Sequence, residues 1–116
     1  MIIKAFMKQY VIDELRPADF NIIKEFLAET HESSELDHLY WFRLDDKILS
    51  PLQAEHKDCY PFYFAVELEP DRICFELLIR SRNRVRCDCM AYATEEQRNW
   101  LIRSVDDVLF RLNINV

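Results

Sequence analysis

Two short segments carry the residue types from which a metal site can be built. His56 and Cys59 stand three positions apart, and Cys87 and Cys89 stand two apart. Imidazole nitrogen and thiolate sulfur are the ligands that tetrahedral zinc prefers, and short spacings let one turn of chain present two of them to the same ion. The sequence therefore allows a zinc site made by all four side chains, provided that the 50–60 segment reaches the later cysteines.

A simpler interpretation of the later cysteines competes with the metal site. Residues alternate between apolar and polar types along the 84–92 segment, so a strand there would point Cys87 and Cys89 to the same face as phenylalanine and leucine side chains. Cysteine is often buried as a small apolar residue. Buried packing and zinc binding thus remain two interpretations of the same thiols.

Glu67, Glu76 and Cys74 are the catalytic candidates, because the same alternation places all three on the opposite, outer face of the sheet. Two neighbouring carboxylates can divide the roles of acid and base, and a thiol can act as a nucleophile. The alternative is that they are ordinary residues of a solvent-facing sheet surface. No motif adds a further group that would hold a substrate.

Arginines recur at every second position from Arg80 to Arg86, a pattern that could contact phosphates. The chain as a whole has a net charge of −6, which repels nucleic acid, and no aromatic residue is interleaved for base stacking. The sequence therefore disfavours nucleic acid as a partner and favours a solvated strand end, partly paired with acidic neighbours.

Composition predicts one globular domain over residues 1–116, since half of the residues are hydrophobic and 31% are charged. The chain contains no glycine. Phosphate-binding loops, dinucleotide-binding turns and the strained turn of serine hydrolases all depend on glycine, so these classes are excluded.

No apolar run approaches the length of a signal peptide core or a membrane span. We therefore expect no membrane association and a cytoplasmic location, where thiols stay reduced. The four cysteines are accordingly interpreted as packed, reactive or metal-binding groups and not as disulfides.

Apolar residues recur at helical spacing in two segments, which predicts helices at about 17–28 and 94–112. Pro17 suits a first helical position, and Thr94 begins a capping-box sequence. A second capping-box sequence at Ser50 predicts a short helix toward Lys57. Residues 39–44 read as a strand, whereas residues 2–10 could begin as strand or helix.

A register follows if Pro70 and Asp71 form a two-residue hairpin turn. The apolar face then pairs Leu68 with Ile73, Val66 with Phe75, Phe64 with Leu77 and Phe62 with Ile79. A further turn at residues 81–83 would set Leu77 opposite Cys87, Phe75 opposite Cys89 and Ile73 opposite Ala91. The predicted fold is therefore α+β: an antiparallel sheet of four to five strands, with a three-strand meander at about 61–92 and both long helices packed on one face.

The outer face of this sheet carries more apolar groups than a solvent-exposed surface usually has, which is typical of an interface. The candidate interface residues are Tyr63, Leu78, Arg86, Met90 and Tyr92. The sequence thus favours a non-catalytic module that binds a protein partner or forms a homodimer. A zinc-stabilised domain and a small enzyme are the alternatives.

Overall fold

The computed structural model describes residues 8–30, 32–33, 36, 38–83 and 87–115. Its elements, in chain order, are β1 (Gln9–Ile12), α1 (Pro17–Thr30), β2 (Glu32–Ser33), β3 (Leu39–Arg43), η2 (Asp46–Ile48), α2 (Pro51–Glu55), η3 (Lys57–Cys59), β4 (Phe62–Glu69), β5 (Arg72–Glu76), β6 (Arg80–Ser81) and α3 (Glu95–Arg111). The helices labelled η are single turns of 3-10 helix.

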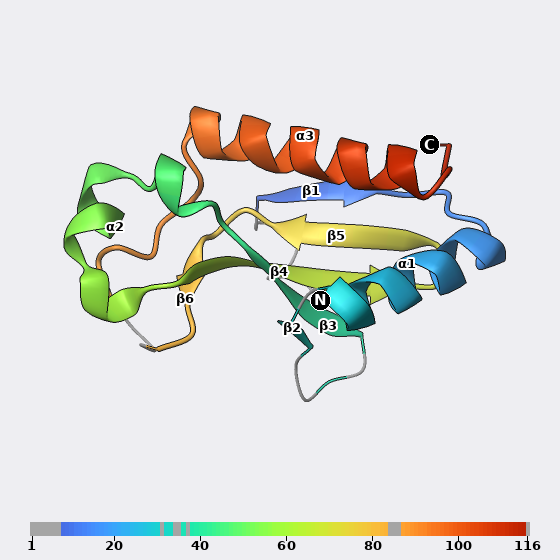
Figure 1. Ribbon diagram of the computed structural model, residues 1–116, viewed down its shortest axis with the longest axis horizontal. Helices are drawn as coiled ribbons and strands as arrows, with labels where there is room; N and C mark the ends of the chain where they lie inside the picture. Colours follow the sequence, from blue (N-terminus) through green and yellow to red (C-terminus); the bar gives the residue numbers. More distant parts are fainter. Residues whose placement is uncertain (1–7, 31, 34–35, 37, 84–86, 116) are drawn as a thin grey trace.

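The strands of the described ranges form one antiparallel sheet in the order β1-β5-β4-β3-β2, and β6 pairs with the start of β4 (Figure 1). This arrangement confirms the predicted α+β class and its antiparallel sheet. The main path holds five strands, as predicted, and the two-residue β6 adds a sixth.

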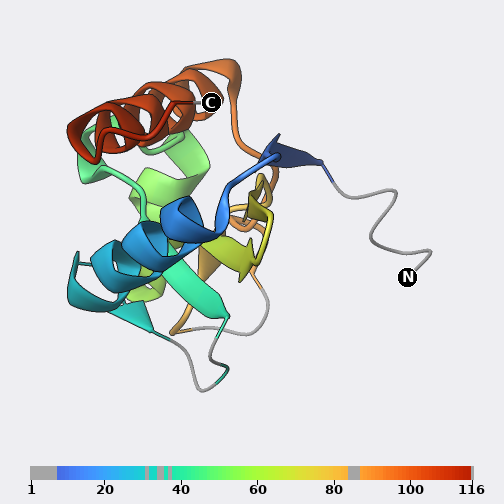
Figure 2. The same ribbon diagram turned by 90° about the vertical axis from the view of Figure 1, so that its right-hand side faces the viewer.

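Helices α1 and α3 cover the same face of the sheet, as the sequence predicts (Figures 1 and 2). Helix α1 begins at Pro17 and buries Ile23 and Leu27. Helix α3 buries Leu101, Val105 and Leu109, which recur on one side. In the part of the chain that the structure describes, no helix has the length and apolar character needed to cross a membrane.

Both ends of helix α3 are defined by residues other than glycine. At its N-terminus, Thr94 Oγ1 accepts from the Gln97 N–H and Gln97 Oε1 accepts from the Thr94 N–H, which is the predicted capping box. Beyond its C-terminus, Asn113 adopts a left-handed φ of 60°. Asparagine tolerates this region better than most residues, so it terminates the helix where glycine usually would.

The β4–β5 hairpin confirms the predicted two-residue turn. Its pairs near the turn share the predicted register: Val66 with Phe75, Leu68 with Ile73 and Glu69 with Arg72. The apolar members of these pairs are all buried beneath the helices. The turn therefore determines which residues of the hairpin form the core.

Farther from the turn the predicted register is wrong by two residues, because Phe62 faces Ser81 and not Ile79. The intervening chain leaves β4, and the Ile79 N–H donates to the Ala91 carbonyl at 3.0 Å. A shift of two keeps the same face inward, since side chains alternate with a period of two. Ile79 is accordingly still fully buried.

The outer edge of β5, assigned by the sequence to a third meander strand, is occupied by β1. Phe75 faces Tyr10, where the predicted register places Cys89. The third segment pairs over a shorter stretch, through a bridge between Leu78 and Tyr92. The predicted positions of the cysteines opposite β5 are therefore wrong.

Strand β1 also resolves part of the segment at residues 2–10, whose structure the sequence left open. Gln9 and Tyr10 are strand, and residues 2–7 lie outside the described ranges.

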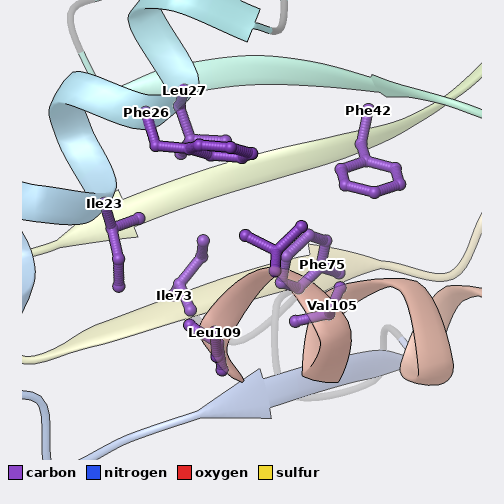
Figure 3. A pocket seen from close by; sticks show the side chains of 9 residues that line it. Ile23, Phe26, Leu27, Phe42, Ile73, Phe75, Val105 and Leu109 are labelled. Atoms are coloured by element: carbon purple, nitrogen blue, oxygen red, sulfur yellow. The ribbon is translucent and has the colours of Figure 1, made fainter. Parts of the chain in front are cut away.

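Between α1, α3 and the sheet lies a cavity of about 20 Å³ without a polar lining atom (Figure 3). Its wall consists of Ile23, Phe26, Leu27, Phe42, Ile73, Phe75, Val105, Val108 and Leu109. A void so small and apolar offers water no hydrogen-bond partner and is expected to stay dry. Apolar packing of the two helices on the sheet forms the wall of this cavity.

Candidate metal centre

The capping-box sequence at Ser50 determines where His56 is placed. Ser50 Oγ accepts from the Gln53 N–H at 3.2 Å, and Gln53 Oε1 accepts from the Ser50 N–H at 2.9 Å. The resulting helix α2 lasts five residues, and His56 is its C-cap, with its N–H donating to the Gln53 carbonyl. The chain then turns through η3, which brings Cys59 into the interior.

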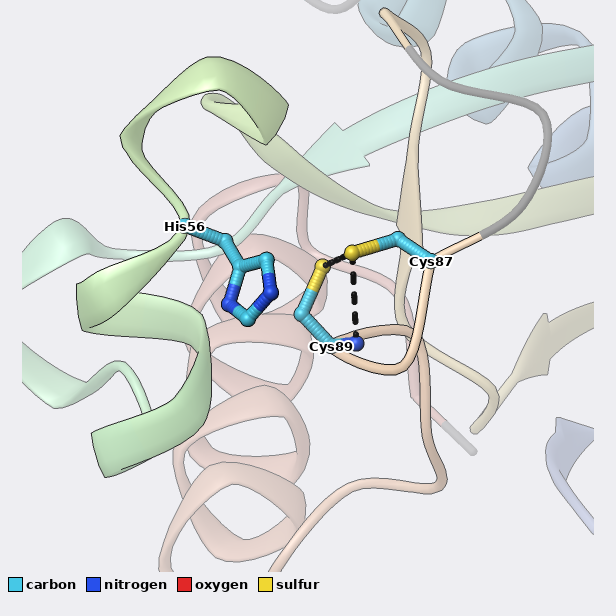
Figure 4. Close-up of side chains that lie close together, drawn as sticks. All are labelled: His56, Cys87 and Cys89. Carbon is cyan, nitrogen blue, oxygen red and sulfur yellow. Dashed lines mark hydrogen bonds between the residues drawn. The ribbon is translucent and has the colours of Figure 1, made fainter.

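A second hydrogen bond orients the His56 ring. Its Nδ1 lies 2.7 Å from the Leu52 carbonyl oxygen, which can only accept, so Nδ1 carries the proton. The lone pair is then on Nε2, and the ring turns that nitrogen toward the two cysteine sulfurs (Figure 4). A backbone carbonyl that fixes the tautomer in this way is characteristic of metal-binding histidines.

Cys87 and Cys89 lie in a tight turn and not in the predicted strand. The turn closes when the Met90 N–H donates to the Cys87 carbonyl at 3.0 Å. It brings the two sulfurs within 2.8 Å, with Cys89 Sγ–H donating to Cys87 Sγ (Figure 4). Cys89 is 1% exposed, whereas Cys87 is partly exposed at the edge of the core.

These segments, far apart in the sequence, meet in space. The ligand atoms of His56, Cys87 and Cys89 all lie within 4.8 Å of one another. The Cys59 thiol is close enough to the later cysteines to shift the pKa of both of their thiols, but it is not part of the group that lies within 4.8 Å. Three of the four predicted ligands therefore form a compact group, whereas binding by Cys59 stays a prediction.

Residues in and just after strand β6 hold the segment around Cys59. Ser81, which is 7% exposed, donates from its hydroxyl to the Cys59 carbonyl at 2.6 Å. Asn83 donates from its side-chain amide to the Tyr60 carbonyl. The backbone around Cys59 is thus fixed by hydrogen bonds that do not involve its thiol.

The two thiols of the turn differ in acidity. The pKa of Cys87 is lowered because the Cys89 thiol and then the Cys89 backbone N–H donate to its sulfur, with smaller contributions from the nearby Cys59 and, when its ring is protonated, from His56. Burial, together with the smaller effect of the hydrogen bond to Cys87, raises the pKa of Cys89 to about 12. Cys87 is therefore the more acidic of the two thiols.

Sulfur and imidazole donors in one partly buried group suit a borderline or soft cation. Zinc is bound by such ligands in tetrahedral sites, whereas Mg²⁺ and Ca²⁺ require oxygen. The cluster of His56, Cys87 and Cys89 can therefore hold a metal ion of the zinc class.

The catalytic candidates of the outer face have separate partners. Arg80 Nε donates to Glu76 Oε1 at 2.6 Å, and His38 Nε2 lies 3.8 Å from Glu67 Oε2. Cys74 faces Glu67 across the β4–β5 pair but is only 7% exposed. The catalytic role of these residues stays a prediction.

The predicted interface residues fall in different environments. Tyr63 is 5% exposed, in edge contact with the Trp41 ring, and the Arg82 guanidinium lies over both rings. Met90 packs against the main core, which corrects its predicted outward position. Tyr92 is 41% exposed and bridges to the half-buried Leu78.

Arg84 and Arg86 lie outside the described residues. The predicted contacts of these arginines on the outer face are therefore not described by the structure.

Sequence reasoning missed a pair of buried glutamines next to the metal ligands. Gln53 and Gln97 are 2% and 1% exposed, and Gln97 Nε2 donates to Gln53 Oε1 at 2.9 Å. Each glutamine is the third helical residue of a capping box, a role that the sequence does reveal. The contact between the two capping boxes forms only in the folded chain, so no short stretch of sequence predicts it.

Comparisons of this chain with protein-family models, with curated proteins and with solved structures gave no match. The functional argument therefore rests on the residues and their geometry.

Proposed function

We propose that this chain is a zinc-stabilised domain in which His56, Cys59, Cys87 and Cys89 bind one Zn²⁺. The observation that carries the proposal is the convergence of the ligand atoms of His56, Cys87 and Cys89 within 4.8 Å of one another. The tautomer of His56, set by the Leu52 carbonyl, adds support because it leaves Nε2 available toward the sulfurs.

Metal binding would require a small opening of the turn. Two thiolates on a tetrahedral zinc, each about 2.3 Å from the metal, lie about 3.8 Å apart. In the structure Cys89 Sγ–H donates to Cys87 Sγ at 2.8 Å. Loss of that proton leaves two anions that repel each other, and a divalent cation between them removes the repulsion.

The bound ion would join two segments that have little regular structure of their own. Helix α2 has five residues, too few to be stable alone. The turn at residues 87–90, called the cysteine turn below, lies outside every helix and strand. A metal bridging them favours the folded chain, because the unfolded chain cannot present all four ligands together. The role of the ion is then structural.

Cobalt binding tests the proposal, because Co²⁺ occupies zinc sites and reports sulfur ligation through thiolate-to-cobalt absorption. The unaltered protein should bind one Co²⁺ with this absorption, and Zn²⁺ should displace it. Cys89→Ser should weaken both the binding and the absorption, because it removes one of the proposed thiolate ligands. Cys74→Ser is the matched control, since it removes a buried thiol on the other side of the sheet, and it should bind as the unaltered protein does.

Equal cobalt binding by both variants would contradict the proposal, because the sulfur ligand would then not be Cys89. A protein that takes up no Co²⁺ or Zn²⁺ after full reduction of its thiols would also refute it.

A protein-binding or homodimeric role stays a prediction beside the metal centre. Among its proposed residues that the structure describes, Tyr92 is the most exposed, at 41%, and Val11 on strand β1 is 42% exposed. Light scattering during size exclusion tests it: a dimer that becomes monomeric in Tyr92→Asp supports the role. A monomer at high concentration refutes self-assembly.

A further inference from the structure

Gln53 and Gln97 form a buried, hydrogen-bonded amide pair outside the ligand cluster. Gln97 Nε2 donates to Gln53 Oε1 at 2.9 Å and to the Ile48 carbonyl at 2.9 Å. Both glutamines are almost fully buried, and among the described residues no buried side-chain nitrogen or oxygen lacks a partner. Burying an amide is costly unless its hydrogen bonds are made, so the pair can adopt few other arrangements.

This pair joins the same two stretches of chain that supply the ligands. Gln53 precedes His56 by three residues, and its backbone carbonyl accepts from the His56 N–H at 3.1 Å. Gln97 belongs to the first turn of α3, which follows the cysteine turn after a short extended stretch. Figure 1 shows α2 and the start of α3 at the same end of the sheet.

The extended stretch between the cysteines and Gln97 is itself held. The Ala93 N–H donates to the Leu77 carbonyl at 2.8 Å, and the Ile79 N–H donates to the Ala91 carbonyl at 3.0 Å. The path from Gln97 back to the cysteine turn is therefore supported by the sheet. The amide pair thus holds α2 against the start of α3, whose position is already fixed by these hydrogen bonds.

We propose that Gln97 is a positioning residue of the metal centre, which holds α2 so that His56 Nε2 meets the cysteine sulfurs before metal arrives. The inference rests on the proposed zinc site. Outer partners that orient metal ligands typically change metal affinity by about 10- to 100-fold when removed, because the ligands must then be ordered by the metal itself. Gln97 would act on the metal through Gln53 and His56.

The test measures Co²⁺ affinity and the ligand-field spectrum at a temperature where every variant is folded. Gln97→Met keeps the side-chain length but removes both N–H donors together with the Oε1 acceptor of the capping box, and it should weaken Co²⁺ binding about 10- to 100-fold. It should also change the ligand-field bands, which report how the imidazole sits on the metal, while the thiolate-to-cobalt absorption remains at saturation.

Asp19→Ala is the matched control for a general loss of stability. Asp19 is 3% exposed and accepts hydrogen bonds from Arg16 at the start of α1, remote from α2 (Figure 1). This variant should unfold at a lower temperature but bind Co²⁺ with unchanged affinity and spectrum. Gln53→Met removes the shared acceptor and leaves the Gln97–Ile48 bond, so it replaces Gln97→Met if that variant does not fold.

Unchanged affinity and ligand-field bands in a folded glutamine variant would overturn the positioning role while leaving the metal site intact. An equal loss of affinity in Asp19→Ala would overturn it as well, because the effect would then be one of stability. Absence of Co²⁺ binding by the unaltered protein would refute the metal centre, and with it this inference.

Discussion

The two ends of the helix-covered sheet face are built by different means. At one end, α1 and α3 close over the sheet around a small cavity lined only by apolar groups. At the other end, α2, η3 and the cysteine turn are held by hydrogen bonds among glutamine, serine, histidine and backbone groups.

This difference follows from the length of the elements. Helices of 14 and 17 residues present complete apolar stripes, so burial of area is enough to place them. A helix of five residues buries too little, so directional bonds must determine its position. The polar end is accordingly where ligand atoms are held in defined directions, and where we place the function.

Metal removal should have the largest effect, and it should act through the polar end alone. With free Zn²⁺ about a thousandfold above its dissociation constant, linkage contributes about 4 kcal/mol to the free energy of unfolding. Excess chelator should therefore lower the midpoint of thermal unfolding by roughly 12–25 °C. Cys74→Ser should show the same drop, whereas Cys89→Ser should show a much smaller one, because it binds the metal more weakly. If chelator leaves the midpoint unchanged, the polar end is not stabilised by metal, and the proposed difference between the two ends is wrong.

Leu109→Ala should weaken the apolar end by nearly as much. Leu109 is 5% exposed and lines the cavity, so its truncation should cost about 3 kcal/mol of unfolding free energy. None of the proposed ligands lines that cavity, so the loss should be equal with and without zinc. Denaturant titrations of both forms measure it, and a zinc-dependent loss would show that the ends are coupled.

Acidification should weaken metal binding without comparable effect on the apolar end. Because burial raises the pKa of Cys89 to about 12, its thiol keeps its proton near neutral pH, and the metal must displace that proton. Affinity should therefore fall as pH falls, by about tenfold, or 1.4 kcal/mol, per pH unit for each proton displaced. Competition with a chelator of known pH dependence gives the slope, and a flat profile would contradict thiolate ligation by Cys89.

Filling the cavity should produce the smallest change, and a favourable one. Val105 projects into the cavity from α3 (Figure 3), and Val105→Ile adds one methylene to its wall. We expect a gain of about 0.5–1 kcal/mol in unfolding free energy, with zinc affinity unchanged. Thermal unfolding measures the gain. A loss would mean that the wall is already fully packed.

Local signals predicted most of the fold. Both capping boxes and the Pro70–Asp71 turn were visible because their hydrogen bonds and dihedral preferences involve residues only a few positions apart. The candidate ligands were visible by type for the same reason. The edge of β5 was not predictable, since Tyr10 and Cys89 both suit an apolar position beside Phe75 and only their competition over the whole chain selects one.

The helices, the central hairpin and the four candidate metal ligands can be predicted from local properties, namely periodicity, capping and residue chemistry. The turn that places the cysteines beside His56 and the contact between Gln97 and Gln53 arise only when distant parts of the chain pack together. Those contacts join distant segments, and their positions depend on how β1, β6 and α2 pack together. Packing of that kind is a property of the complete core and is not encoded in any one segment.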